Sequence, residues 1–284
     1  MSISSLRCRA LSALIVPAAA AIVLVLPVPV GASTGTREIS PEQAGYTATG
    51  AQFKAISDSL YLTEPNADHH EVASFGHSVQ LWSSGLVVAL GVTTSTAHTY
   101  DEYTTYATIY DRSTHQVIAS NPNDVFCFED DTCISGETGG FNNSIDSPIT
   151  MQITYDPATG VLNMFENDTG DGFSFTSSYT APGQSFTEAR VGTDFGSTPW
   201  DNSYSHTAPV IARRIQAYND VSLTTYSGHT ASLSSWWVHH KLLANTGQQS
   251  GHDWVAVPGD LTNGGSRFET SFVPLSGQAP NHVR

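Results

Sequence analysis

Apolar and polar residues alternate along short stretches of this chain, and no segment sustains the apolar period of an amphipathic helix. The clearest stretch is 149–155, which runs into the turn sequence Asp156-Pro-Ala-Thr-Gly160 and then into a second stretch at 161–165. Two such stretches joined by a short turn are typical of a β-hairpin. Alternation leaves each strand with one apolar face, so the chain is expected to fold from stacked β-sheets.

Comparable stretches recur along the chain, rich in Thr, Tyr, Val and Ser and separated by Gly, Asn and Asp. They lie at 78–82, 86–92, 103–110, 173–179, 189–194, 210–218, 221–225 and 254–257. Short strands at this spacing predict an all-β fold, a two-sheet antiparallel β-sandwich. One sandwich domain is expected at 45–275, because no linker rich in Pro or Ser divides it. The polar segment 33–44 and the tail 276–284 are expected to be flexible.

The N-terminus has the layout of an export signal. Arg7 and Arg9 precede the apolar run 10–30, which ends in the small residues Val30-Gly31-Ala32. This pattern predicts a signal peptide at 1–32, cleaved after Ala32, and hence a secreted, extracellular protein that leaves no membrane segment behind. The alternative is an uncleaved membrane anchor, because the run is long enough to span a bilayer. Cys8 would leave with the signal peptide.

The composition of the chain excludes some partners. The signal segment holds two of the 11 basic residues and none of the 26 acidic ones, so the mature chain would carry nine basic residues against 26 acidic ones, a net charge of −17. Such an acidic surface offers no footprint for nucleic acid and no basic patch for anionic lipid.

Two cysteines, Cys127 and Cys133, would remain after signal cleavage. In an oxidising compartment they most simply form one disulfide that closes a small acidic loop at a hairpin tip. A metal site is the alternative, but the segment between the cysteines lacks further ligands at zinc spacing.

A series of short segments carries a family resemblance. Ser78-Val-Gln-Leu-Trp82, Ala89-Leu-Gly-Val92 and Thr187-Glu-Ala-Arg-Val-Gly-Thr-Asp194 are the most informative, and 45–56 with Pro65, 103–110, 148–165 and 218–225 complete the series. In this order the segments resemble the glutamic peptidases called eqolisins, which are secreted, acid-active enzymes. The resemblance implies a concanavalin-like β-sandwich and a catalytic glutamine and glutamate.

The chain departs from the family where the catalytic pair is expected. The glutamine position, two residues before the Gly-Val pair, is Ala89, and the glutamate position falls on Gly192 or Thr193, depending on a one-residue gap. The enzymes need a carboxyl group to take a proton from water and an amide to polarise the carbonyl. Glu188 matches the first glutamate of its segment, which we interpret as structural. The resemblance therefore implies an eqolisin-like sandwich without the family's catalytic pair.

Two function classes follow. The first is a secreted, non-catalytic protein that binds carbohydrate or peptide on a sandwich face. The second is a secreted acid-active endopeptidase with a displaced pair, in which Gln80 supplies the amide and Glu188, Glu102 or Asp194 the carboxylate. A surface or matrix protein without a specific small ligand is a third class. They differ in whether an amide and a carboxyl group face each other on one sheet.

Other candidate sites have simpler interpretations. The pairs His69-His70 and His239-His240 would each place their rings on opposite faces of a strand, which disfavours a metal site. The acidic run 166–172 lacks calcium-loop spacing and is interpreted as a hairpin tip, and Ser266 as a turn residue. Neither a metal nor a cofactor is expected. Trp200 lies in a loop rich in Gly, Ser and Asn, where its ring could stack on a sugar.

Overall fold

The computed structural model describes a defined set of residues, all of which belong to the second of the two units into which the chain divides, 33–284. The first unit, 1–32, lies outside the described residues. So do the predicted signal peptide, the whole predicted tail 276–284, and Trp200. The described ranges are 37–40, 43–61, 73–97, 100–128, 133–135, 148–168, 173–194, 216–236, 238–245 and 254–274.

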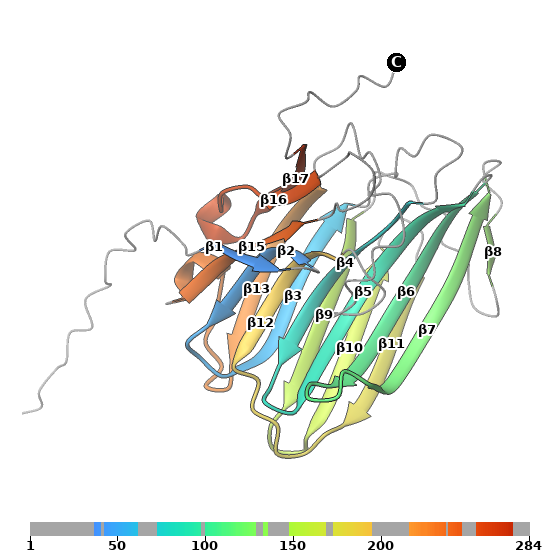
Figure 1. Cartoon of the computed structure of the whole chain (residues 1–284). Helices are drawn as coiled ribbons and strands as arrows, with labels where there is room; N and C mark the ends of the chain where they lie inside the picture. The colour runs from blue at the N-terminus through green and yellow to red at the C-terminus, as the bar shows by residue number, and fades with distance from the viewer. Residues whose placement is uncertain are drawn as a thin grey trace, which may run out of the picture. The chain divides into compact units, whose positions relative to one another are not determined.

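The strands form two stacked layers (Figure 1). Neighbouring strands in the first layer follow the order β15 (Val238–Asn245), β2 (Gln43–Thr49), β12 (Glu188–Asp194), β4 (Ala73–Trp82), β5 (Leu86–Ala97), β6 (Tyr100–Asp111), β7 (Val117–Phe128) and β8 (Cys133–Ser135). All of these pairings are antiparallel. The short strand β1 (Arg37–Ser40) pairs with β15 and is parallel to it.

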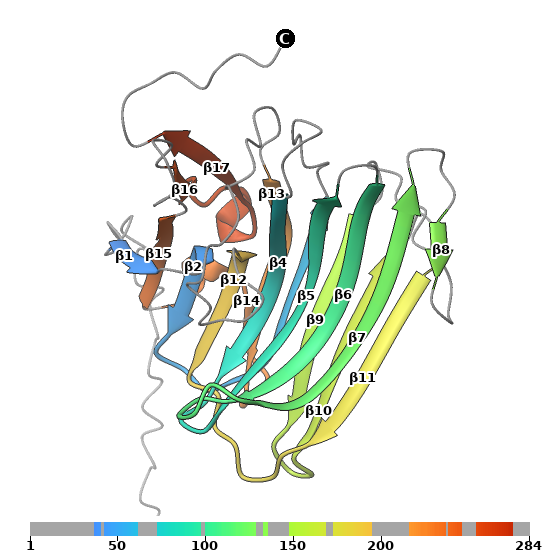
Figure 2. The ribbon, with the colours of Figure 1, turned by 45° about the vertical axis from the view of Figure 1, so that its right-hand side comes forward.

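The second layer lies behind β4–β7 in Figure 2. Its strands follow the order β17 (Phe268–Pro274), β13 (Gln216–Thr225), β3 (Phe53–Tyr61), β9 (Pro148–Asp156), β10 (Val161–Asp168) and β11 (Phe173–Thr180), with β14 (Thr230–Ala231) on β13. Strand β16 (Trp254–Pro258) pairs with both β15 and β17, so it joins the layers at one edge. Two 3₁₀ turns complete the described elements, η1 (Leu233–Ser235) and η2 (Asn263–Gly265).

The hydrophobic core fills the space between the layers. Alternate residues of β9 are buried, as the sequence pattern predicts for a strand with one face on a core. The first layer contributes Val79, Leu81, Val88 and Leu90, and the second contributes residues such as Ile56, Leu60, Met151, Ile153 and Leu162. The opposite face of the first layer is therefore the outer face of the sandwich.

The structure confirms the predicted all-β sandwich and the 149–165 hairpin, whose strands β9 and β10 pair in register. Among the described residues no α-helix occurs, and no helix has the length and apolar character to cross a membrane. The described end of the predicted stretch 210–218, residues 216–218, and the stretch 221–225 lie in one strand, β13, which has an irregularity at Asp220, where φ is 53°. That positive φ explains why the sequence was interpreted as two strands.

Other differences concern the N-terminal part and the strands that the alternation did not indicate. Part of the segment expected to be flexible is structured, since 37–40 form β1 and 43–44 begin β2. The segment 45–56, part of the series that carries the family resemblance, divides at Gly50 (φ 91°) and passes from β2 in the first layer to β3 in the second. Strands β7, β15 and β17 were not predicted. In β7, Pro122 interrupts the alternation of apolar and polar residues. Strand β8 pairs with β7 only at 125–127, which follow this proline.

Candidate functional site

The outer face of the first layer carries a row of mostly polar residues that runs across five strands. Thr47, Arg190, Gln80, Ala89 and Thr108 lie directly opposite one another from β2 to β6. Directly opposed residues of a sheet share a face, and the residues next to Gln80 and Ala89 in sequence belong to the core. The row therefore lies on the outer face, where the family resemblance places its catalytic strands.

The Gln80 side chain is buried and held by neighbours two residues away on its own strand. Its Oε1 accepts a hydrogen bond from Trp82 Nε1 at 2.8 Å, and its Nε2 donates to Ser78 Oγ at 2.9 Å. Residues two apart in a strand point to the same face, so the alternation of β4 itself builds this network. Both ends of the Gln80 amide are thus engaged by protein groups.

The indole ring of Trp82 lies under two guanidinium groups. Arg190 Cζ is 4.0 Å from the ring centroid and Arg112 Cζ is 5.1 Å from it, both within the range of cation–π attraction. Trp82 is only 4% exposed. Arg112 comes from the turn after β6, where its Nη1 donates to Ser83 O at 2.7 Å. The turn after β4 is therefore tied to the turn after β6.

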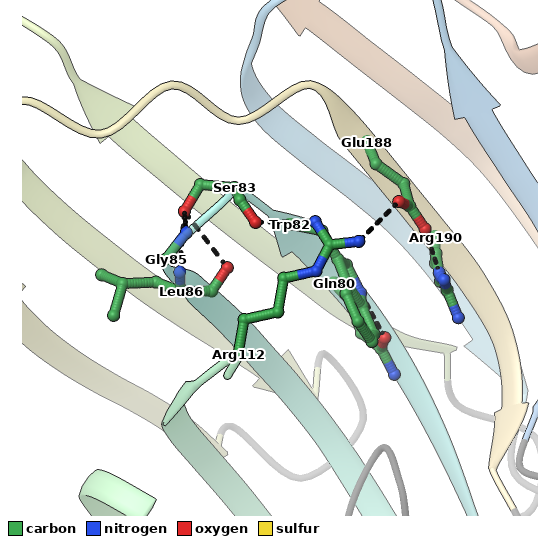
Figure 3. Close-up of polar contacts among 8 residues, drawn as sticks. All are labelled: Gln80, Trp82, Ser83, Gly85, Leu86, Arg112, Glu188 and Arg190. Atoms are coloured by element: carbon green, nitrogen blue, oxygen red, sulfur yellow. Dashed lines mark hydrogen bonds and ion pairs between the residues drawn. The ribbon is translucent and has the colours of Figure 1, made fainter. Parts of the chain in front are cut away.

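Glu188 joins the two arginines (Figure 3). Its Oε1 accepts from Arg190 Nε, and its Oε2 lies 3.7 Å from Arg112 Nη2. The side chains of Glu188, Arg190 and Arg112 are 16%, 18% and 35% exposed, whereas Gln80 and Trp82 beside them are buried. We call Trp82, Arg112, Glu188 and Arg190 the arginine–tryptophan cluster. Its charged groups are the part of the site that reaches solvent.

Small residues occupy the positions where the resemblance expects the catalytic pair. Ala89 is fully buried and packs with Trp82, Val87 and Tyr110. Gly192 lies on the outer face opposite Gly45, and the two backbones are so close that a Cβ on Gly192 would lie 2.3 Å from Ala44 O. Thr193 has the opposite orientation, since its Oγ1 lies 2.6 Å from the hydroxyl of Tyr218 inside the sandwich. Of the two alternatives left by the sequence, Gly192 is the one on the face of Ala89.

The structure brings together one pair of the displaced candidates. Glu188 is two residues from Arg190, which lies directly opposite Gln80. Asp194 is four residues from Arg190, ~13 Å along the strand, and Glu102 is six residues from Thr108, the residue of β6 level with Gln80, or ~20 Å. Of the four candidates, only Gln80 and Glu188 are therefore neighbours.

The remaining sequence candidates fall into three groups. The pair His69-His70 lies outside the described residues, as do the side chains of His239 and His240. Cys127 lies directly opposite Cys133 in the β7–β8 register, and the disulfide stays a prediction because their side chains are not described. Glu166, the first residue of the predicted acidic tip, instead points into the core and is fully buried, and Ser266 donates to Asn263 O within a turn. The described residues contain no group of three metal-ligating side chains.

A second set of polar side chains lies between the layers. His77 Nδ1 is 2.9 Å from the Tyr218 hydroxyl, and Thr105 donates to Glu166 Oε1 at 3.2 Å. Asp58 is 1% exposed, and neither of its carboxyl oxygens has a hydrogen-bond partner in the described part of the chain. Burial raises the pKa of Asp58 well above its usual value and lowers the pKa of His77 to about 3. Burial thus favours the neutral form of both groups.

Sequence reasoning missed the two arginines of the cluster. The spacing of Glu188 and Arg190 by two residues on a predicted strand was a usable signal, because such residues share a face. Trp82 likewise follows Gln80 by two residues. Arg112 gave no such signal, since it reaches Trp82 from a separate turn.

Comparisons with known proteins agree with this architecture. No protein-family model matches the chain, and no curated protein sequence matches it. Among solved structures, scytalido-glutamic peptidase with a peptide-based transition-state analogue is similar over 83% of this chain and all of its own, with 14% identity and a TM-score of 0.52. SCP-B, a member of the eqolisin family in complex with the tripeptide Ala-Ile-His, has the same coverage, 13% identity and a TM-score of 0.49. The chain thus has a β-sandwich fold like that of the eqolisin glutamic peptidases.

Proposed function

We propose that this protein is an exported, non-catalytic member of the eqolisin-like sandwiches, which binds a peptide or carbohydrate on the outer face of its first layer. The β-sandwich fold supports this function, and the row of outer-face residues around Ala89 is where we expect the ligand to bind. The exposed charged groups there can contact a ligand. The third class, a matrix protein without a specific ligand, lacks any observation in its favour.

One observation carries the non-catalytic interpretation: Gly192, which shares the outer face with Ala89, has no room for a side chain. A Cβ at this position would meet Ala44 O at 2.3 Å and Gly45 Cα at 2.8 Å. Real Cβ atoms do not approach backbone atoms so closely, so a carboxylate cannot be carried at this position without separating β2 from β12. The methyl group of Ala89 likewise offers neither an amide nor a proton acceptor.

The alternative, an acid peptidase that uses Gln80 and Glu188, is less well supported by the geometry. The amide of Gln80 already bonds Trp82 and Ser78. The carboxylate of Glu188 faces two guanidinium groups, which occupy its oxygens. A general base must instead reach a water molecule and take its proton.

The deciding experiment incubates the purified mature protein with a denatured protein substrate from acid to neutral pH. We expect no cleavage above background, since loss of both catalytic groups removes several orders of magnitude in rate. Acid cleavage that disappears in Gln80→Ala or Glu188→Gln would establish the peptidase alternative. A parallel thermal-shift screen of peptides and oligosaccharides tests the binding role, and stabilisation by one class supports it.

We also propose that the protein is exported and that Cys127 and Cys133 form a disulfide. The Arg-flanked apolar run and the Val-Gly-Ala end support cleavage after Ala32, and the facing positions of Cys127 and Cys133 in the β7–β8 register support a bridge. Mass spectrometry of protein secreted by an expressing cell tests both. We expect an N-terminus at Ser33 and two thiols that alkylate only after reduction. A product that begins at Met1, or two thiols that alkylate fully without reductant, contradicts these statements.

A further inference from the structure

Arg190 has hydrogen-bonding capacity that the protein does not use. Its Nε donates to Glu188 and its guanidinium plane lies on Trp82, and within the described part of the chain its two Nη atoms have no hydrogen-bond partner. The side chain is 18% exposed, so the group is largely fixed but still reachable from solvent. Two parallel N–H donors on a planar, immobilised guanidinium match the two oxygens of a carboxylate.

Thr47 provides a second, independent observation. It lies directly opposite Arg190 in the β2–β12 register, so the Cβ atoms of the two residues are ~5 Å apart on the outer face. Thr47 is 4% exposed, and its Oγ1 is buried without a hydrogen-bond partner among the described residues. A buried hydroxyl of this kind normally has a partner. An anion seated against Arg190 would supply one, because its oxygens accept from both residues.

The charge of the arginine–tryptophan cluster also indicates an anion. Two guanidinium groups face one carboxylate, so the cluster carries one positive charge in a chain whose net charge is −15. One additional carboxylate brings the cluster to neutrality. The partly buried surroundings strengthen this attraction relative to a fully exposed pair.

A peptide fits this site better than a sugar ring does. Carbohydrate binding commonly uses an open aromatic face, and the face of Trp82 is covered by guanidinium groups, with only 4% of the residue exposed. We infer that Arg190, with Thr47, binds the carboxylate of a peptide ligand. This inference rests on the proposed binding function and adds to it the chemical group that is recognised.

The test compares matched peptides by NMR titration of the intact mature protein. The probes are acetyl-tetra-alanine as the free acid, the same peptide as its amide, an amidated acetyl-peptide with one internal glutamate, and trigalacturonate. We expect the free acid or the glutamate peptide to bind at least about tenfold more tightly than the neutral amide, the loss expected when charge-assisted hydrogen bonds are removed. Which of the two binds distinguishes a terminal from a side-chain carboxylate. Binding should also weaken as the pH falls below about 3.5, where the α-carboxyl group protonates.

Variants add a second measurement. Arg190→Lys keeps the charge but loses the planar fork, so it should reduce the preference for acid over amide. Arg267→Lys is the matched control, because Arg267 also pairs with a glutamate two residues away, Glu269 at 2.9 Å, and it should leave the preference unchanged.

The outcomes separate the two proposals. Equal binding of the neutral amide and both carboxylate peptides by the unmodified protein overturns the inference but leaves the binding function standing, and so does a preference that is undiminished in Arg190→Lys. Binding of trigalacturonate without any peptide overturns the peptide assignment alone. Absence of binding by every probe overturns both.

Discussion

Two carboxyl groups of this protein, Glu188 on the outer face and Asp58 between the layers, lie in opposite environments. Glu188 is partly exposed and faces two guanidinium groups, so its charge is paired. Asp58 is buried, has no hydrogen-bond partner in the described part of the chain, and has a raised pKa caused by desolvation. The outer face therefore keeps its charges available for a ligand, whereas the interior suppresses them, which makes stability depend on pH.

The largest effect is expected where the outer face has no room for a side chain. Gly192→Ala places a Cβ against Ala44 O at 2.3 Å, which forces β2 away from β12 in the middle of the first layer. We expect a loss of about 3 kcal/mol or more in unfolding free energy, or no folded protein. Chemical denaturation measures it. Gly85→Ala is the control, since its Cβ would meet only Gln184 Oε1 at 3.9 Å. Equal stability of the two variants contradicts the close approach.

The interior carboxyl group should make the folded protein less stable as the pH rises. The folded-state pKa of Asp58 lies above its unfolded value, so its contribution to stability is fully present below about pH 4 and is lost as the pH rises. Asp58→Asn removes that loss. Urea midpoints between pH 4 and 6.5 should then rise with pH in the variant. Asp111→Asn is the control. Hydrogen bonds from Ser113 and Thr114 lower the pKa of this exposed carboxyl group to about 2, so in the folded protein it is already ionised between pH 4 and 6.5.

The interior histidine should make the folded protein less stable as the pH falls. Burial lowers the pKa of His77 to about 3, so its contribution to stability is fully present above the unfolded value of about 6.5 and is lost as the pH falls. The two contributions have opposite signs, so they oppose each other in the unmodified protein. In His77→Gln the contribution of Asp58 remains unopposed, and stability should fall with rising pH. The same sign of slope in both variants contradicts this account.

The smallest effect is expected from the outer carboxylate. Glu188→Gln breaks two ion pairs that are partly screened by water, so we expect a loss of about 1 kcal/mol at low salt and less at high salt. Thermal unfolding at two salt concentrations measures it. Glu269→Gln breaks a more exposed pair and should have a smaller effect. A loss at Glu188 that is large and independent of salt would show that the cluster acts as a buried network.

The strand pattern was readable from the sequence because a strand buries every second residue. The hairpin at 149–165 and the strands 78–82, 86–92 and 189–194 were predicted this way, and the same alternation already places Gln80 beside Trp82 and Glu188 beside Arg190. It also places Asp58 with Ile56 and Leu60 on the core side of β3. Strands interrupted by irregular residues, such as β7 with Pro122, gave no such pattern.

The sequence by itself determined the β architecture and the acidic charge, because each follows from local pattern or composition. Only the tertiary structure decided between Gly192 and Thr193, since the answer depends on the register of β12 against β2 and β4. It alone brought Arg112 from a distant turn onto Trp82 and Thr47 opposite Arg190. These are contacts between strands far apart in the chain, and a local pattern cannot fix which strands become neighbours.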